Sequence, residues 1–199
     1  MDVGPAELRV LGCLIEKQRT TPDAYPLSLN SLRLACNQTT NRDPVVSYEE
    51  PEIRDALERL GRRGWTRLAS GPGSRAVKYR HLFGDAVGVD EEEIAVLAVL
   101  MLRGPQTPGE LKARTERLHA FDGLDGLVAT LDRLQARDFV ERLERRPGQK
   151  EERYAQLLGD SGASQPAPPA VAGGSRIGDL EERVARLEEL VEELRRELL

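Results

Sequence analysis

The chain repeats itself, and the repeated unit is a helix followed by a basic hairpin. The helix motif Leu57-Glu58-Arg59-Leu60 recurs 74 positions later as Leu131-Asp132-Arg133-Leu134. Tyr79 in the predicted hairpin recurs 75 positions later as Tyr154. A repeat of this length predicts two copies of one small domain within the 199 residues.

A helix upstream of this unit repeats with a different offset, which locates an insertion. Glu7-Leu8 and Thr21-Pro22 match Glu93-Ile94 and Thr107-Pro108, each 86 positions later. The first copy is therefore 12 residues longer, between its Thr-Pro pair and the repeated helix. We expect any activity peculiar to the first copy to lie in this insert, near residues 37–48.

Local signals predict three helices and a hairpin in each copy. In the first copy, a buried stripe follows Pro5, Ser28 caps a short helix, and the capping-box spacing of Ser47 to Glu50 starts a third helix that Gly64 ends. Strands are expected over 65–69 and 76–80. In the second copy, the helices are expected from Asp90 to Leu102, from Thr107 through Leu118 and over 124–137, and the hairpin over 139–154.

This order of elements predicts a mainly α fold with small β-hairpins, in the arrangement of tandem winged helix-turn-helix domains. The expected organisation is two such domains at residues 1–85 and 86–158, followed by a linker and a C-terminal helix. Residues 159–175 are rich in Pro, Gly, Ala and Ser, which predicts a flexible linker.

Residues 176–199 carry an unbroken heptad stripe. Its apolar positions are spaced alternately three and four residues apart: Ile177, Leu180, Val184, Leu187, Val191, Leu194 and Leu198. β-Branched residues at most of the a positions and Leu at every d position favour a parallel two-stranded coiled coil. The stripe predicts a homodimer, and the alternative is that it packs back onto the same chain.

Charge excludes nucleic-acid binding through bulk electrostatics. The net charge is −5, distributed as +2 over residues 1–85, −4 over 86–160 and −3 over the remainder. Proteins that bind nucleic acid through overall charge are basic. Any such binding must come from a local patch.

The first predicted hairpin supplies such a patch, since it holds cations and no carboxylate. We take as candidate DNA contacts the cations of the hairpin and of the helix end before it: Arg62, Arg63, Arg67, Arg75, Lys78 and Arg80. A wing of this kind lies along phosphates in many winged-helix proteins. The alternative is that these cations form a solvated basic edge of the domain that binds no partner molecule.

The third helix of the first copy argues against ordinary docking in the major groove. It opens with Glu49, Glu50, Glu52 and Asp55, which would repel phosphates. The second hairpin is also unpromising, because its cations alternate with carboxylates.

The insert is chemically distinctive and has two interpretations. Its polar side chains are Asn37, Gln38, Asn41 and Arg42. Such groups can form paired hydrogen bonds with bases. They also commonly bond to nearby backbone and hold turns, and loop pinning is the interpretation we favour.

Catalytic and metal-binding patterns are missing from the sequence. Cys13 and Cys36 lie on apolar stretches and are expected to be buried thiols, and His81 and His119 are isolated. We therefore expect no enzymatic activity, no cofactor and no metal. Without a signal peptide or a membrane span in the sequence, we expect a cytoplasmic protein with no membrane partner.

Several runs of this sequence resemble the bacterial YceH-like family, a family defined as a domain of unknown function. The runs that carry the likeness are Glu7–Lys17, Thr21–Pro22, Tyr25–Asn30, Ala35–Val45 and Leu102–Leu111. The resemblance extends from about Glu7 to Asp160, and members often end in a coiled coil. It implies a tandem winged-helix fold and a bacterial cytoplasmic protein, and it supplies no functional residues.

Two functions follow as hypotheses from the residues and the resemblance together. The first is non-enzymatic DNA binding with a regulatory role, through the first domain. The second is a protein-interaction adaptor that does not bind DNA, in which acidic helix faces and the insert receive a partner protein.

Overall fold

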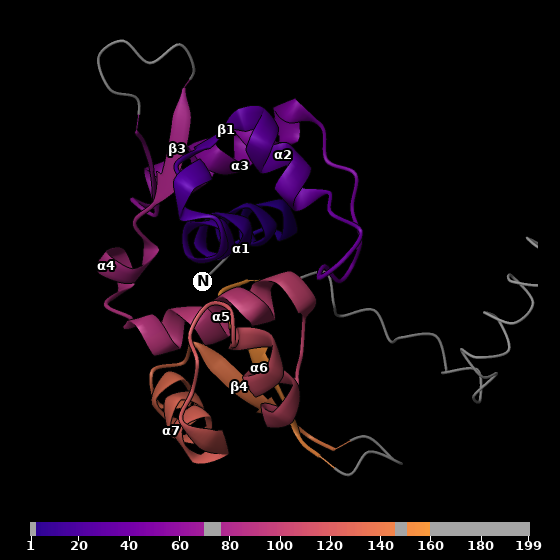
Figure 1. Cartoon of the computed structure of the whole chain (residues 1–199), viewed down its shortest axis with the longest axis vertical. Coiled ribbons are helices and arrows are strands. Elements are labelled where there is room, and N and C mark those ends of the chain that lie inside the picture. The colour runs from indigo at the N-terminus through magenta and orange to yellow at the C-terminus, as the bar shows by residue number, and fades with distance from the viewer. Residues whose placement is uncertain (1–2, 70–76, 146–150, 160–199) are drawn as a thin grey trace, which may run out of the picture. The chain divides into compact units, whose positions relative to one another are not determined.

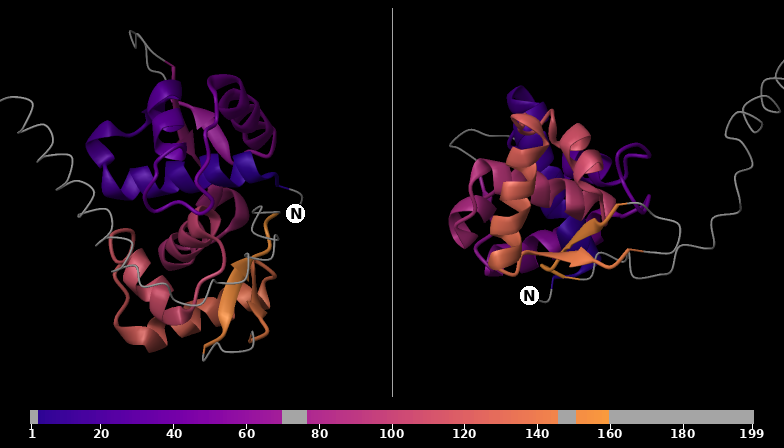
Figure 2. Two further views of the ribbon diagram at one scale, coloured as in Figure 1. Left: turned by 90° about the vertical axis from the view of Figure 1, so that its right-hand side faces the viewer. Right: turned by 90° about the horizontal axis from the view of Figure 1, so that it is seen from below.

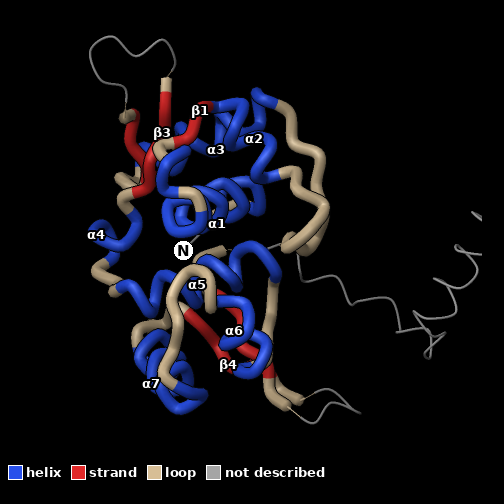
Figure 3. Tube along the Cα trace, viewed as in Figure 1, coloured by secondary structure: helices blue, strands red, loops and turns tan. Residues whose placement is uncertain are grey.

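The first copy folds into helices that precede a small antiparallel sheet (Figures 1 and 3). Its elements are α1 (Pro5–Thr20), the 3-10 turn η1 (Pro22–Ala24), β1 (Leu27–Ser28), α2 (Leu29–Cys36), α3 (Glu50–Arg62), β2 (Thr66–Leu68) and β3 (Lys78–His81). The strand order is β1-β3-β2, with both pairings antiparallel. The hairpin β2–β3 therefore has β1 on one edge only.

The second copy follows the same plan after a short connecting helix, α4 (Phe83–Val87). Its elements are α5 (Glu91–Arg103), α6 (Pro108–Thr115), α7 (Gly123–Ala136), β4 (Val140–Leu143) and β5 (Arg153–Gln156). The strands β4 and β5 form an antiparallel pair. The chain is thus mainly helical with small antiparallel sheets.

This computed structural model describes residues 3–69, 77–145 and 151–159. Arg75 and all but the first residue of the predicted linker lie outside the described residues. The seven positions of the predicted dimerisation stripe lie outside them as well: Ile177, Leu180, Val184, Leu187, Val191, Leu194 and Leu198.

The two copies match in strand pairing as well as in sequence. Tyr79 in β3 pairs with Leu27 of β1, and its repeat Tyr154 in β5 forms an antiparallel bridge with Gln106. In both copies, the residue that pairs with the tyrosine lies just before the second helix. Backbone pairing therefore holds the start of that helix against the hairpin.

The predicted caps account for the starts of three of the seven described helices. Ser28, Asp90 and Thr107 each accept a hydrogen bond from the backbone N–H three residues later. Asp90 and Thr107 form complete capping boxes with Glu93 and Glu110. These contacts satisfy N–H groups that have no partner inside the helix.

Three features differ from the expectation. The helix predicted to begin at the Ser47 box begins at Glu50, because Glu49 and Glu52 form the capping box and Asn37 holds the backbone of Tyr48. The helix expected to reach Leu118 ends at Thr115, where Leu118 and His119 N–H both donate to the Thr115 carbonyl. The elements β1 and α4 were not predicted, since two and five residues carry too little periodicity.

Helix α1 lies between the rest of its own copy and α5 of the second copy (Figures 1 and 2). Because α1 is covered on opposite sides, every residue from Glu7 to Ile15 is buried. Gly12 marks the closest approach, since a Cβ added there would lie 2.9 Å from Cγ of Leu102. Side chains of both copies consequently join one hydrophobic cluster.

Among the helices that the structure describes, none combines the length and the apolar character needed to cross a membrane.

Candidate nucleic-acid interface

The hairpin β2–β3 of the first copy places two arginines directly opposite each other. Arg67 on β2 pairs with Arg80 on β3, and both are exposed. Lys78 lies two residues before Arg80 and therefore on the same face of the sheet. Three of the predicted DNA contacts thus share one face of the hairpin.

These two arginines have no carboxylate partner within the described part of the chain, where no ion pair involves Arg67 or Arg80. The hairpin of the second copy differs. Arg142 and Arg145 both approach Glu152, at 2.9 and 3.5 Å. The second hairpin therefore neutralises its own cations, as the charge pattern of the sequence predicted.

The opposite face of the first hairpin forms a groove with α3. This groove has a volume of about 820 Å³, and Leu68 and Tyr79 line its hairpin side. Arg54 and Arg62 of α3 line its other side. Glu58 also lines the α3 side, and Leu68 is 61% exposed, so the groove combines an exposed apolar surface with an edge of mixed charge.

The predicted contacts at the end of α3 have partners of their own. Arg62 donates to Glu58 one turn earlier, at 2.6 Å, and both side chains are largely exposed. The Arg63 guanidinium lies 5.7 Å from the centre of the Trp65 ring. An exposed ion pair of this kind contributes little to stability, so Arg62 is available to a stronger anion.

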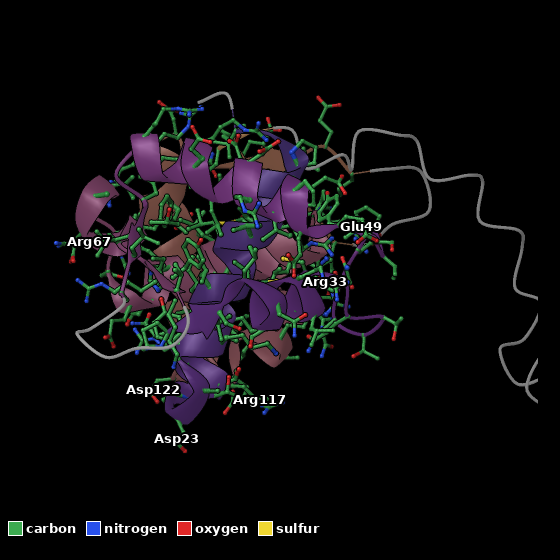
Figure 4. The ribbon with its side chains drawn as sticks, turned by 90° about the horizontal axis from the view of Figure 1, so that it is seen from above. Asp23, Arg33, Glu49, Arg67, Arg117 and Asp122 are labelled. Carbon is green, nitrogen blue, oxygen red and sulfur yellow. The ribbon has the colours of Figure 1, made fainter. Side chains whose placement is uncertain are left out.

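Four carboxylates gather at the N-terminal end of α3 and just before it. Glu49, Glu50, Glu52 and Asp55 are all exposed at its N-terminal end. Figure 4 shows Glu49 and Arg67 on opposite sides of the molecule when it is viewed from above. The basic surface is therefore made by the C-terminal end of α3 and the hairpin, and the N-terminal half of α3 is acidic.

The insert is attached to the domain by its own polar side chains. Asn37 donates to the Tyr48 carbonyl and accepts from the Tyr48 N–H, both at 2.8 Å, which closes the insert at its two ends. Asn41 has φ +61° and accepts a hydrogen bond from Arg103 of α5. Gln38 accepts from Arg42 at 2.9 Å.

Arg42 lies at the centre of this attachment, with none of its side chain exposed. Its guanidinium donates to both carboxylate oxygens of Glu16, at 3.0 and 2.6 Å, and to the carbonyls of Ala35 and Asn41. The hydrogen bonds and charge of Glu16 raise the pKa of Arg42 against the opposing effect of burial. All four insert residues named from the sequence thus make contacts within the chain.

A second buried arginine, which the sequence did not single out, also holds the insert. Arg9 of α1 donates to the carbonyl of Cys36 at 3.1 Å and to that of Pro44 at 2.6 Å. Burial lowers the pKa of Arg9. Arg9 belongs to helix α1, and the apolar stripe of that helix did not predict that a charged residue would be buried.

The two cysteines lie in α1 and α2, and His81 lies in β3 next to Arg80. Cys13 and Cys36 are free and buried, as expected, and the hydrogen bond with Cys13 and burial raise the pKa of Cys36. The His81 backbone N–H donates to the Tyr25 hydroxyl at 2.8 Å. Among the described residues, no cluster of His, Cys, Asp and Glu is arranged to hold a metal ion.

Comparison with known proteins identifies the family. Residues 3–149 match the family described as "Protein of unknown function, DUF480". A UPF0502 protein of Solibacter usitatus is 49% identical, covering 96% of this chain and 95% of its own. UPF0502 proteins of Pectobacterium carotovorum and Geotalea daltonii are 46% and 49% identical, over 96% and 95% of this chain and 94% and 89% of theirs. The chain belongs to this bacterial family, DUF480, together with the UPF0502 proteins.

Proposed function

We propose that this chain is a non-enzymatic DNA-binding protein with two winged-helix domains, which contacts duplex phosphates through the β2–β3 hairpin of the first domain. The observation that carries the proposal is the cross-strand pair of Arg67 and Arg80. Like charges directly opposite in a sheet are destabilising. A phosphate between the two guanidinium groups removes that repulsion and provides charge-assisted hydrogen bonds.

The charge distribution along α3 defines how the domain would dock. In ordinary winged-helix docking, the N-terminal half of the third helix meets base edges. Here that half carries Glu50, Glu52 and Asp55 against Arg54 alone, whereas Arg62, at the end of α3, lines the groove beside the hairpin. We therefore propose docking led by the hairpin, with contacts mainly to the backbone and little sequence preference.

A double substitution in the hairpin tests this proposal. Changing Arg67 and Arg80 to Ala should weaken binding to all duplex sequences alike, because phosphate contacts carry no sequence information. The slope of log affinity against log salt should flatten by up to about 0.9 per lost phosphate contact. Fluorescence anisotropy with a labelled duplex, measured over a series of salt concentrations, gives both quantities.

The matched control is the double substitution of Arg142 and Arg145 to Ala in the second hairpin, which removes the same charge. We expect it to leave affinity nearly unchanged, since both arginines already approach Glu152. Equal affinity of the parent and the Arg67/Arg80 variant would show that the hairpin is not the contact surface.

A parent chain that binds no duplex at moderate salt would favour the adaptor function instead. The observation that supports an adaptor is the exposed apolar surface of the first copy, where Val45 in the insert and Leu34 on α2 are both 57% exposed. Exposed carboxylates at the start of α3 follow Val45 in the chain. A basic, partly apolar protein segment would suit that surface.

We also propose that the heptad stripe of residues 176–199 makes the protein a parallel homodimer. Pairing would place four winged-helix units on one particle and strengthen weak individual contacts through effective concentration. Light scattering of the full chain should give twice the monomer mass, and Leu187→Glu, which puts a charge at a d position, should give the monomer. A monomeric parent chain would contradict the proposed homodimer.

A further inference from the structure

A small polar pocket lies where the insert meets the second copy, away from the hairpin surface. Its volume is about 220 Å³. Arg103 enters it from the end of α5, Arg114 from α6, Arg153 from the start of β5 and Asn41 from the insert. The pocket thus gathers residues that are up to 112 positions apart in the sequence.

The pocket holds more positive charge than its carboxylates neutralise. Glu110 is shared by two of the arginines, since its carboxylate oxygens lie 3.5 Å from Arg114 and 3.6 Å from Arg153. One of these oxygens also accepts the Thr107 N–H at 3.0 Å. The only other carboxylate lining the described pocket is the exposed Asp43.

Arg103 differs from Arg42, Arg114 and Arg153, which each form an ion pair with a carboxylate. It donates to the Asn41 side chain, and the described residues provide no carboxylate that forms an ion pair with it. Burial, followed by the charges of Arg114 and Arg42, lowers the pKa of Arg103. Arg42 also lines the pocket, but all of its N–H groups face partners already described, so it forms part of the wall.

Gln106 provides a second, independent indication that the pocket binds a ligand. Its side-chain amide donates to the carbonyls of Arg103 and Pro105, at 3.1 and 2.9 Å, which fixes the direction of the group. Its oxygen Oε1 is buried and has no hydrogen-bond donor among the described residues, and the whole residue is only 4% exposed. A buried acceptor without a donor is rare in folded proteins. Gln106 lines the pocket, so the unmatched acceptor belongs to a residue of the pocket wall.

We propose that this pocket binds a small phosphate that keeps an O–H group, namely hydrogen phosphate or a phosphate monoester with a neighbouring hydroxyl. The phosphate oxygens accept from Arg103 and Arg114, and the O–H donates to Oε1 of Gln106. Sulfate has the same shape but no proton to donate at neutral pH, and a phosphodiester of a nucleic-acid backbone lacks the proton too. The site is separate from the hairpin and does not rest on its binding DNA.

The test is a titration of the full chain with inorganic phosphate, followed through the NMR signals of the arginine Nε–Hε groups. We expect saturable shifts of the Arg103 and Arg114 signals. Sulfate should bind about tenfold more weakly, since it leaves the Gln106 oxygen without a donor. This comparison uses the parent protein and does not depend on how a variant folds.

Two variants of equal charge then locate the site. Arg103→Gln should weaken phosphate binding about tenfold or more, because a charge-assisted contact is lost. Arg117→Gln, at an exposed position that does not line the pocket (Figure 4), should leave it unchanged. Arg114→Gln should repeat the loss if Arg103→Gln does not fold.

Three results would overturn the proposal. In the first, phosphate causes no saturable shift of the arginine signals. In the second, sulfate binds as tightly as phosphate. In the third, the Arg103 and Arg117 variants weaken phosphate binding equally. If a DNA duplex shifts the same arginine signals while inorganic phosphate does not, the pocket belongs to a nucleic-acid surface.

Discussion

We expect Arg42→Met to lower the free energy of unfolding by about 3 to 5 kcal/mol, the typical cost of removing one partner of a buried ion pair. The Arg42 guanidinium is fully enclosed, and Glu16 keeps only 14% of its side chain exposed. Without Arg42, the carboxylate of Glu16 stays in a poorly hydrated site. The carbonyl of Ala35 loses its side-chain donor as well.

Urea unfolding followed by circular dichroism measures this loss. Arg54→Met is the matched control, because Arg54 is exposed and lies 4.0 Å from Glu50 on the surface of α3. Exposed pairs of this kind contribute about 0 to 1 kcal/mol. Adding Glu16→Gln to the Arg42 variant should recover part of the stability, since it removes a largely buried carboxylate whose remaining cationic partner is Lys17, at 3.4 Å. An Arg42 variant as stable as the Arg54 variant would contradict the buried network.

Lowering the pH from 6.5 to about 4 should cost the folded chain up to about 3 kcal/mol through His81 alone. Burial, and then the charge of Arg19, lowers the pKa of His81 from 6.5 to about 4 in the folded state. The nearby charges are mixed, since Asp85 raises this pKa and Arg80 lowers it further. Nδ1 of His81 is buried and has no hydrogen-bond partner in the described part of the chain.

The direction of this effect follows from proton binding. Well above pH 6.5, His81 is neutral in both states and stability does not depend on its protonation. Between pH 6.5 and about 4, the unfolded chain takes up the proton while the folded chain resists it, so stability falls as the pH is lowered. Below about pH 4 both states are protonated and the contribution of His81 stops changing.

Comparison of the parent with His81→Gln isolates this contribution from other titrating groups. The stability difference between the two chains should depend on pH between 6.5 and 4, because Gln does not titrate. His119→Gln is the control, since His119 lies 3.9 Å from Glu92 at a partly exposed site. Parallel stability curves for the parent and His81→Gln would contradict the assignment.

Local sequence was sufficient for most helix boundaries in both copies. Asp90 and Thr107 act within one turn of the helices that they cap, so their spacing to Glu93 and Glu110 already contains the interaction. The start of α3 is a boundary that local sequence did not predict correctly. Ser47 has equally good spacing, but Asn37, from 10 residues earlier in the chain, bonds to the neighbouring Tyr48 and the helix begins later.

The candidate binding surfaces also have some features that the sequence predicted and others that it did not. The sequence predicted that the first hairpin would be basic and the second nearly balanced, because composition alone contains that information. It did not predict that Arg67 would lie opposite Arg80, since a shift of one residue in register would have separated them. The insert residues were named from the sequence, but the sequence left recognition and pinning as alternatives.

The sequence by itself thus determined the repeat, the order of the elements, the capped helix ends, the position of the insert and the charge of each hairpin. These features depend on residues within one or two turns of each other, or on composition. Only the tertiary structure decided that α1 packs on α5, that Arg9 and Arg42 are enclosed, and that Arg103, Arg114 and Arg153 converge beside Gln106. The physical reason is that burial and charge pairing depend on which distant segments meet, and hydrophobic periodicity does not specify the side chains that a helix will contact.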